Sequence, residues 1–384
     1  SQSSQPLRGL GALDLHPEVG RRGRFQSDPS VQLSASLWLS LAFDDRRRTP
    51  SSAGIHLHQA RGFLLAHSWP RPALRTRQAV LTAVCAYFNP FGSGAREQAY
   101  ERFRAGLEAA GITVVCAEQK FAGVPRVGGE GDLYVEGGDH LWQKECLLQL
   151  GVERGLAVGA SRLLLLDADI VFETQDAWAR IDRSFEDLDW FQPFESVALE
   201  YADGPLVRAS ALSFPDPCYG LGHPGSCWAG TAEVFRTVPI YPYALLGGGD
   251  VVLTHLLAWC WKHGPHSQRF ADLATYLCGR ALYSGLLPSV LAWAETAGHH
   301  RFRYGHTPEV RIRALDHGPR ARRRYHSRYA KWQCGSRPPM PGRDFFVGAK
   351  GLLMWAETPN PWELVATKYF ESRERDVPDE LARC

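Results

Sequence analysis

Two aspartates stand two positions apart, at Asp167 and Asp169, directly after a run of four leucines at 163–166. Carboxylates at the end of such an apolar run are costly to bury unless a partner neutralises their charge. A hard divalent cation is a natural partner, because carboxylate oxygens suit Mg²⁺ and Mn²⁺, and it would bridge to a diphosphate. The spacing therefore favours a site for Mn²⁺ or Mg²⁺, and the alternative is an acidic turn that caps the next helix.

The elements around these aspartates indicate a sheet that would bring them to its edge. Buried apolar runs predict strands, and helical spacing of apolar residues predicts helices. The expected strands are 79–87, 112–117, 162–166 and 190–194, and the expected helices are 96–110, 140–156 and 176–185. This alternation predicts an α/β fold with a mixed, mostly parallel sheet flanked by helices. Ligands bind beyond the carboxyl ends of the strands in such sheets, where the two aspartates, Glu118 and the loop after Tyr87 fall.

Three side chains open the helix that is expected before the third of these strands, namely Trp142, Lys144 and Glu145. Only six of the 43 basic residues are Lys, so Lys144 departs from an Arg-dominated composition. A contact with a phosphate or a leaving group would suit an ammonium at this place. The alternative is a solvated helix face, on which the lysine stem packs against apolar surface.

Two glycine-containing stretches follow, at 225–230 around Trp228 and at 247–250, which reads Gly-Gly-Gly-Asp. Glycines let a backbone approach a ligand closely. Trp228 is interpreted either as a stacking platform for a sugar ring or as a core residue. Asp250 either meets a ligand or is the N-cap of a helix expected over 251–261.

A basic segment at 301–332 carries nine Arg and one Lys against two acidic residues. Such a run usually forms a solvated face or a nucleic-acid patch. The alternative is a set of cations that neutralises a bound diphosphate.

In its motifs the chain resembles the nucleotide-sugar-dependent glycosyltransferases of the GT-A fold. Asp167-Ala168-Asp169 matches their Asp-x-Asp motif, and within that fold the chain is most similar to bacterial, phage and large-virus glycosyltransferase-like proteins. The shared stretches, in order, are 83–90 (Ala-Val-Cys-Ala-Tyr-Phe-Asn-Pro), 141–145 (Leu-Trp-Gln-Lys-Glu), 166–172, 247–250 and 317–325 (His-Gly-Pro-Arg-Ala-Arg-Arg-Arg-Tyr). The resemblance covers about residues 79–375.

The resemblance implies a metal-dependent transfer of a sugar from a nucleoside-diphosphate sugar, with a UDP-sugar favoured, to a hydroxyl of a saccharide or of a hydroxylated DNA base. It places Mn²⁺ or Mg²⁺ on Asp167, Asp169 and His317. The donor-binding positions that it implies are Tyr87, Phe88, Asn89, Glu118, Lys144, Ala168, Arg320, Arg323 and Arg324. It implies acceptor contacts at Trp228, Gly248 and Gly249, with Asp250 as the general base.

Composition bounds the protein class. The 384 residues are 45% hydrophobic and 22% charged with a net charge of +2, which excludes disorder over the whole length. No run approaches 18 apolar residues and no signal-peptide layout is present, so we expect no membrane span. Nine Cys without metal-site spacing favour reduced, buried thiols and a cytoplasmic location.

The organisation that we expect is one catalytic domain behind an irregular extension. Residues 1–77 form the extension, residues 78–195 the nucleotide-sugar half, residues 196–375 the acceptor half, and residues 376–384 a tail.

Two other functions share parts of this pattern. A nucleotidyltransferase also uses paired carboxylates and a metal, but it normally carries a basic glycine-rich loop after the first strand, and here the first Arg after that strand is Arg96. A non-catalytic nucleic-acid-binding protein would use the Arg-rich 301–332 segment, and its binding would weaken steeply with salt.

Overall fold

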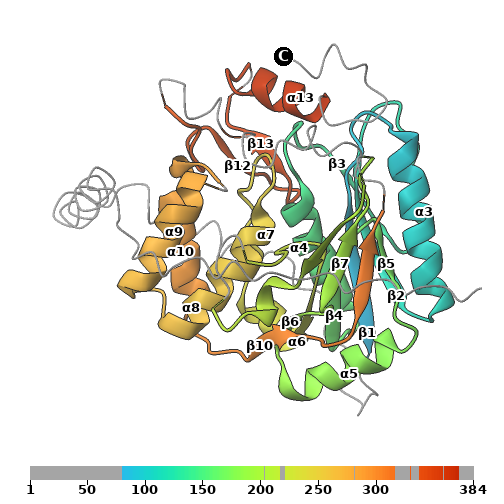
Figure 1. The fold of residues 1–384 in the computed structure, drawn as a ribbon. Coiled ribbons are helices and arrows are strands. Elements are labelled where there is room, and N and C mark those ends of the chain that lie inside the picture. Colours follow the sequence, from blue (N-terminus) through green and yellow to red (C-terminus); the bar gives the residue numbers. More distant parts are fainter. Residues whose placement is uncertain are drawn as a thin grey trace, which may run out of the picture. The chain divides into compact units, whose positions relative to one another are not determined.

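A computed structural model describes residues 80–202, 204–216, 221–280, 282–315, 329, 337–357 and 359–371 (Figure 1). It confirms a mixed α/β fold whose central sheet is mostly parallel and is flanked by helices. The expected extension at 1–77 and the tail at 376–384 lie outside the described residues, and the division into halves remains a prediction.

The central sheet has the order β10-β6-β9-β4-β1-β2-β3 among the described residues. Its members are β1 (Leu81–Tyr87), β2 (Thr113–Lys120), β3 (Leu133–Glu136), β4 (Arg162–Asp167), β6 (Trp190–Gln192), β9 (Cys227–Thr231) and β10 (Tyr304–His306). Only β9 runs against its neighbours in the described sheet, because it pairs antiparallel with both β4 and β6.

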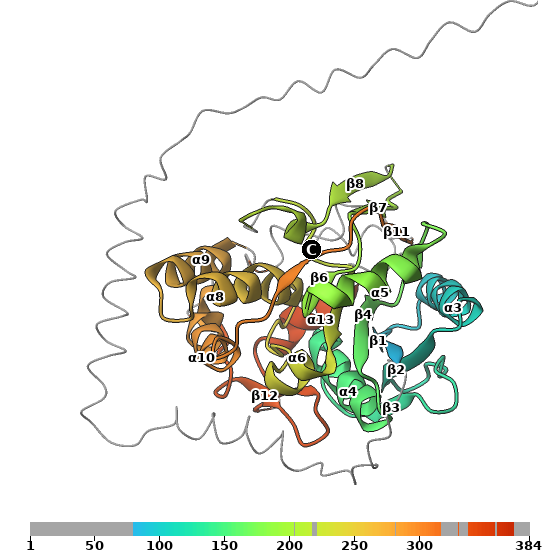
Figure 2. The same cartoon turned by 90° about the horizontal axis from the view of Figure 1, so that it is seen from below.

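Each face of this sheet is covered by its own helices. Successive strand residues point to opposite faces, so Val84 packs on the side of α4 (Lys144–Ala157) and Cys85 on the side of α3 (Gly94–Ala109). The α4 side also carries α6 (Ala232–Thr237), and the α3 side carries α5 (Ala177–Asp187). Figures 1 and 2 show α3 and the α8–α10 group on different sides of the sheet.

The remaining elements complete the two sides. The second sheet, ordered β5-β11-β7-β8, lies on the side of α3 and α5, and it consists of β5 (Ile170–Phe172), β7 (Ser196–Leu199), β8 (Leu206–Ala209) and β11 (Arg311–Ala314). The other elements are α7 (Gly249–Val251), α8 (Leu257–His263), α9 (Gln268–Arg280), α10 (Leu287–Ala297), α13 (Glu363–Glu371), the hairpin of β12 (Phe345–Val347) and β13 (Leu353–Trp355), and short 3₁₀ turns at Ala211–Ser213 and Ser284–Leu286. A π-helical turn at Val252–Leu256 joins α7 to α8.

The predicted strands and helices of the first half are confirmed, with shifted ends. The expected helix over 140–156 begins at Lys144, so Lys144 and Glu145 do open it. The glycine-containing stretch at 225–230, which holds the predicted acceptor contact Trp228, mostly forms the strand β9 inside the central sheet.

Two of the compositional expectations can be compared with the structure. The six described cysteines, Cys85, Cys116, Cys146, Cys227, Cys260 and Cys278, are buried free thiols, as expected. Within the described ranges, no helix combines the length and the apolar character needed to cross a membrane.

Candidate functional site

The candidate site is organised around the ammonium of Lys144, the first residue of α4. Its Nζ lies 2.5 Å from Asp167 Oδ1 and 2.9 Å from Asp250 Oδ1. The Lys144 side chain is only 12% exposed, against 27% for Asp167 and 30% for Asp250. Burial alone would lower the pKa of Lys144, but the two carboxylates outweigh it and raise that pKa above its usual value. The lysine therefore stays charged beside both carboxylates.

The sheet register explains the position of Asp167. Asp167 ends β4 opposite Ala86, next to the β1 residue Tyr87, which pairs with Glu118 of β2. The three strand ends thus lie along one edge, as the parallel pattern predicted. The Asp167 amide donates to the Ser226 carbonyl at 2.8 Å, which ties this edge to β9.

Asp250 reaches the site from a glycine turn. Gly248 has a φ of 102°, a left-handed conformation that glycine adopts without strain, and it precedes α7 as its N-cap. Asp250 is therefore not the helix cap. It lies in the first helical turn, and its side chain meets Lys144 instead. The Trp142 amide donates to the Leu245 carbonyl at 2.9 Å, which fixes the start of α4 beside this turn.

Glu145 lies directly beneath the glycine turn. Its side chain is 1% exposed, and within the described residues neither carboxyl oxygen has a hydrogen-bond partner. A side chain at Gly249 would begin 2.1 Å from Glu145 Oε1, so only glycine fits there. Burial raises the pKa of Glu145 to about 8, against the opposing effect of Lys144 and with a further rise from Asp250. Glu145 is thus protonated at neutral pH, a state that its place at the start of a helix does not indicate.

Trp228 lies in β9 below Lys144 and is completely buried. Its indole Nε1 donates to Thr254 Oγ1 at 2.9 Å, and Lys144 Nζ lies 5.0 Å from the ring centroid. In this conformation the ring supports a cation rather than offering a free face to a sugar.

The residues after β1 form a closed turn. Asn89 Oδ1 accepts the Ser93 amide at 2.9 Å, and Asn89 Nδ2 donates to the Tyr87 hydroxyl at 3.2 Å. Burial raises the pKa of Tyr87 to about 12. Phe88 packs against Phe121, at a centroid distance of 5.4 Å. These side chains shape the edge of the sheet but present little surface, and their contact with a nucleotide remains a prediction.

Glu118 is engaged by its own loop. Its carboxylate accepts the Gly128 amide at 2.9 Å and the Val127 amide at 3.2 Å. Burial raises the pKa of Glu118, and these two hydrogen bonds oppose the rise. The carboxylate thus orders the loop that follows β2, and its contact with a base or ribose remains a prediction.

The predicted residues His317, Arg320, Arg323 and Arg324 lie outside the described residues. The last described residue before them, Leu315, donates its amide to the Asp169 carbonyl at 2.8 Å. Beyond them, the Tyr329 hydroxyl donates to the Gly247 carbonyl at 2.6 Å and accepts the Leu246 amide at 3.1 Å. Within the described ranges, no three His, Cys, Asp or Glu side chains are grouped to hold a metal.

Part of the Arg-rich run serves the fold. Arg303 pairs with Asp189 at 3.1 Å, and Arg313 pairs with Glu200 at 3.0 Å and also with Glu173. These described arginines are neutralised by carboxylates of the same chain. They therefore do not add to a basic nucleic-acid patch.

Sequence reasoning missed one neighbour of Asp250, which is His223. Its ring nitrogen Nε2 lies 3.0 Å from Ser226 Oγ, and it faces the same point above Gly225 as Asp250 Oδ2. The only signal in the sequence was the proximity of His223 to the glycine-containing stretch.

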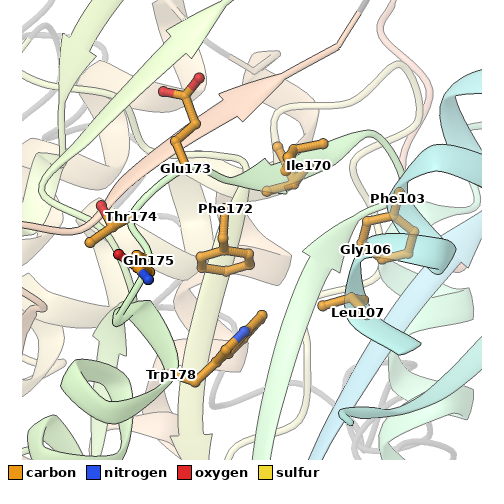
Figure 3. Close-up of a pocket in the computed structure, with 10 residues that line it drawn as sticks. Phe103, Gly106, Leu107, Ile170, Phe172, Glu173, Thr174, Gln175 and Trp178 are labelled. Atoms are coloured by element: carbon orange, nitrogen blue, oxygen red, sulfur yellow. The ribbon is translucent and has the colours of Figure 1, made fainter. Parts of the chain in front are cut away.

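A separate cavity of about 210 Å³ lies between α3 and the segment from β5 to α5 (Figure 3). The Phe172 and Trp178 rings face it, 4.5 Å apart at their centroids, and Leu107 closes it from α3. Figure 3 shows the Glu173 carboxylate pointing away from these rings. Neither Lys144 nor the site aspartates line this cavity.

Comparisons with known proteins give weak likenesses. No family model matches the chain, and no curated protein sequence matches it. Glucosyl-3-phosphoglycerate synthase from Mycobacterium tuberculosis, solved with Mn²⁺, UDP and phosphoglyceric acid, is 11% identical over 59% of this chain and 85% of that chain, with a TM-score of 0.31. Mannose-1-phosphate geranyltransferase from Thermus thermophilus is 15% identical over 59% and 74%, with a TM-score of 0.27. At these values the likenesses support no argument about fold or function.

Proposed function

We propose that this chain is a metal-dependent glycosyltransferase that moves a sugar from a nucleoside-diphosphate sugar to a hydroxyl acceptor. The observation that supports this most is the pairing of Asp167 and Asp250 with one ammonium, that of Lys144, at the carboxyl edge of the sheet. The pairing brings Asp167 and Asp250 to one cation, which supports a metal ligand and a base side by side in the proposed reaction.

The donor set fits a divalent cation. Asp167 and Asp169 offer hard oxygen ligands, and the ammonium beside Asp167 Oδ1 indicates that this edge attracts positive charge. Asp167, Asp169 and His317 would hold Mn²⁺ or Mg²⁺, with the donor diphosphate as a further ligand. The bound ion would supply charge neutralisation for the departing diphosphate.

The chain's own residues then have distinct tasks. Lys144 holds the Asp250 carboxylate in place through their ion pair, and Asp250 accepts the proton of the acceptor hydroxyl. That oxygen forms the bond to the anomeric carbon, and the carbon–phosphate oxygen bond breaks with its electron pair on the nucleoside diphosphate. A direct attack of this kind inverts the anomeric centre. Arg320, Arg323 and Arg324 are proposed to bind the diphosphate.

A panel of nucleoside-diphosphate sugars with Mn²⁺, read by release of nucleoside diphosphate, tests the proposal. The acceptors are simple saccharides and hydroxymethylated DNA, with UDP-sugars as the favoured donors. Asp167→Ala is expected to abolish release. Asp182→Ala is the matched control, because Asp182 forms an exposed ion pair with Arg162 at the other end of β4. No release from any donor, with the Asp167 variant indistinguishable from the parent, contradicts the proposal.

A further inference from the structure

Two side chains of the site, Asp250 and His223, lie over Gly225, and the point between them is here called the Gly225 space. A side chain at Gly225 would begin 2.7 Å from Asp250 Oδ2 and 3.2 Å from His223 Nε2. The other oxygen of that carboxylate, Oδ1, is the one held by Lys144. Asp250 thus has one oxygen toward the lysine and the other toward the Gly225 space.

The His223 main chain is fixed by hydrogen bonds on both sides. Its amide donates to the Ala209 carbonyl at 2.7 Å, and its carbonyl accepts the Ala211 amide at 3.2 Å. The buried side chain of Gln192 donates to the same carbonyl at 2.9 Å. The main chain is thus fixed, and the contact of Nε2 with Ser226 Oγ at 3.0 Å orients the ring, as a binding group requires.

Ser226, the hydrogen-bond partner of the imidazole, has a strained backbone conformation. Ser226 has a φ of 75°, in the left-handed region that residues other than glycine rarely adopt. Such strain costs about 1–3 kcal/mol and collects at functional sites. The serine nevertheless places its hydroxyl 3.0 Å from His223 Nε2 and its carbonyl on the Asp167 amide.

The imidazole is neutral at physiological pH. Burial lowers the pKa of His223 to about 4, although the charge of Asp250 acts in the opposite direction. A neutral imidazole has one donor and one acceptor nitrogen, so it can hydrogen-bond a hydroxyl. Because it carries no charge, it does not replace Lys144 as the cation that pairs with Asp250.

We propose that the acceptor hydroxyl binds above Gly225, between Asp250 Oδ2 and His223, and that His223 is an acceptor-binding residue. This inference rests on the proposed glycosyl transfer. The hydroxyl proton passes to Asp250, its oxygen bonds to the anomeric carbon, and the electron pair of the broken bond leaves with the nucleoside diphosphate. His223 and Ser226 hydrogen-bond the acceptor and keep their protons.

Two substitutions test the inference: one removes the His223 ring, and the other adds a methyl group at Gly225. His223→Ala removes the imidazole, and Gly225→Ala keeps the imidazole but places a methyl group 2.7 Å from Asp250 Oδ2 and 3.2 Å from His223 Nε2. The transfer assay uses the donor from the panel that the parent cleaves fastest, with Mn²⁺ and with water or a saccharide as acceptor. Binding calorimetry uses the corresponding nucleoside diphosphate with Mn²⁺. Each variant is expected to lower the transfer rate by at least about 10-fold, the value of one hydrogen bond to a reacting group, and to bind the nucleoside diphosphate as the parent does.

Rescue separates binding from a structural role. Added imidazole is expected to restore part of the activity of His223→Ala but none of that of Gly225→Ala. His223→Gln, which keeps a polar group near the position of Nε2, is expected to retain more activity than the alanine variant. The matched controls are His266→Ala at an exposed histidine and Gly279→Ala at a helical glycine with open space around it.

The outcomes distinguish this inference from the proposed function. Unchanged transfer by both His223→Ala and Gly225→Ala overturns the inference and leaves the glycosyltransferase proposal intact. Equal loss of nucleoside diphosphate binding and transfer in either variant also overturns it, as does a His223→Ala variant that melts like the parent and loses transfer without rescue by imidazole. A parent that binds no nucleoside diphosphate and cleaves no donor overturns both proposals.

Discussion

Lys144 Nζ lies 2.9 Å from Asp250 Oδ1, although 106 residues separate them in the chain. The contact joins the start of α4 to the start of α7, and the same ammonium lies 2.5 Å from Asp167 at the end of β4. One cation thus neutralises a carboxylate on the proposed donor side and a carboxylate on the proposed acceptor side.

Lys144→Met removes this shared cation and leaves two carboxylates close together. We expect nucleoside diphosphate release to fall by about 100-fold, as when one preorganised charged donor is lost from an active site. The free energy of unfolding is expected to fall by about 2 kcal/mol, because breaking a partly buried ion pair leaves uncompensated charge. Urea denaturation measures the second effect. Lys120→Met is the control, since its exposed pair with Glu136 is expected to contribute nothing measurable.

Glu145 should make stability depend on pH. Its pKa is raised from 4.5 to about 8 in the folded protein, so between these values the folded state holds a proton that the unfolded state has lost. Stability from this group is therefore present at low pH and falls as pH rises through that range. Urea midpoints of the parent and of Glu145→Gln at several pH values measure this. The glutamine variant should lose less stability toward pH 8, whereas Glu101→Gln at an exposed position should follow the parent.

Gly249→Ala tests the contact between the glycine turn and Glu145. The new methyl group would lie 2.1 Å from Glu145 Oε1, and we expect a loss of about 1–3 kcal/mol through overpacking. The loss should be smaller in a Glu145→Ala background, giving a coupling energy above about 0.5 kcal/mol in a double-mutant cycle. Additive effects would show that the two residues do not compete for this space. Gly279→Ala controls for the substitution itself.

Tyr329→Phe removes one hydroxyl that serves two backbone groups of the glycine turn, the Leu246 amide and the Gly247 carbonyl. We expect a loss of about 1–2 kcal/mol in unfolding free energy, because both groups are buried. Because the turn positions Asp250, the rate of nucleoside diphosphate release should fall by more than the loss of folded protein accounts for. Tyr134→Phe, whose ring lies over Arg126, is the control. Parent-like stability and turnover in the Tyr329 variant would contradict this assignment.

The sequence predicted the elements with strong local patterns. The apolar runs of β1, β2 and β4 and the helices between them are recognisable because each lies within one short stretch. The strands β5, β10, β12 and β13 have only three residues each, too few for a periodic pattern. The strand β9 was missed because its glycine and its tryptophan pointed to a ligand loop.

The site was predictable in its residue types but not in its contacts. The motif and the rarity of lysine singled out Asp167, Asp250 and Lys144. Their convergence depends on the start of α4 and on the Gly248 turn, which are set by packing between distant segments. His223 has no sequence signal beyond its proximity to the glycine-containing stretch. The raised pKa of Glu145 has none, because it arises from burial beneath Gly249.

The antiparallel strand β9 has a mechanical consequence. It belongs to the second half of the chain, yet it hydrogen-bonds between β4 and β6 of the first half. A hinge motion between the two predicted halves would have to break the backbone hydrogen bonds of these ladders. For the proposed glycosyl transfer, we therefore expect adaptation to different acceptors to come from side chains and loops rather than from domain closure.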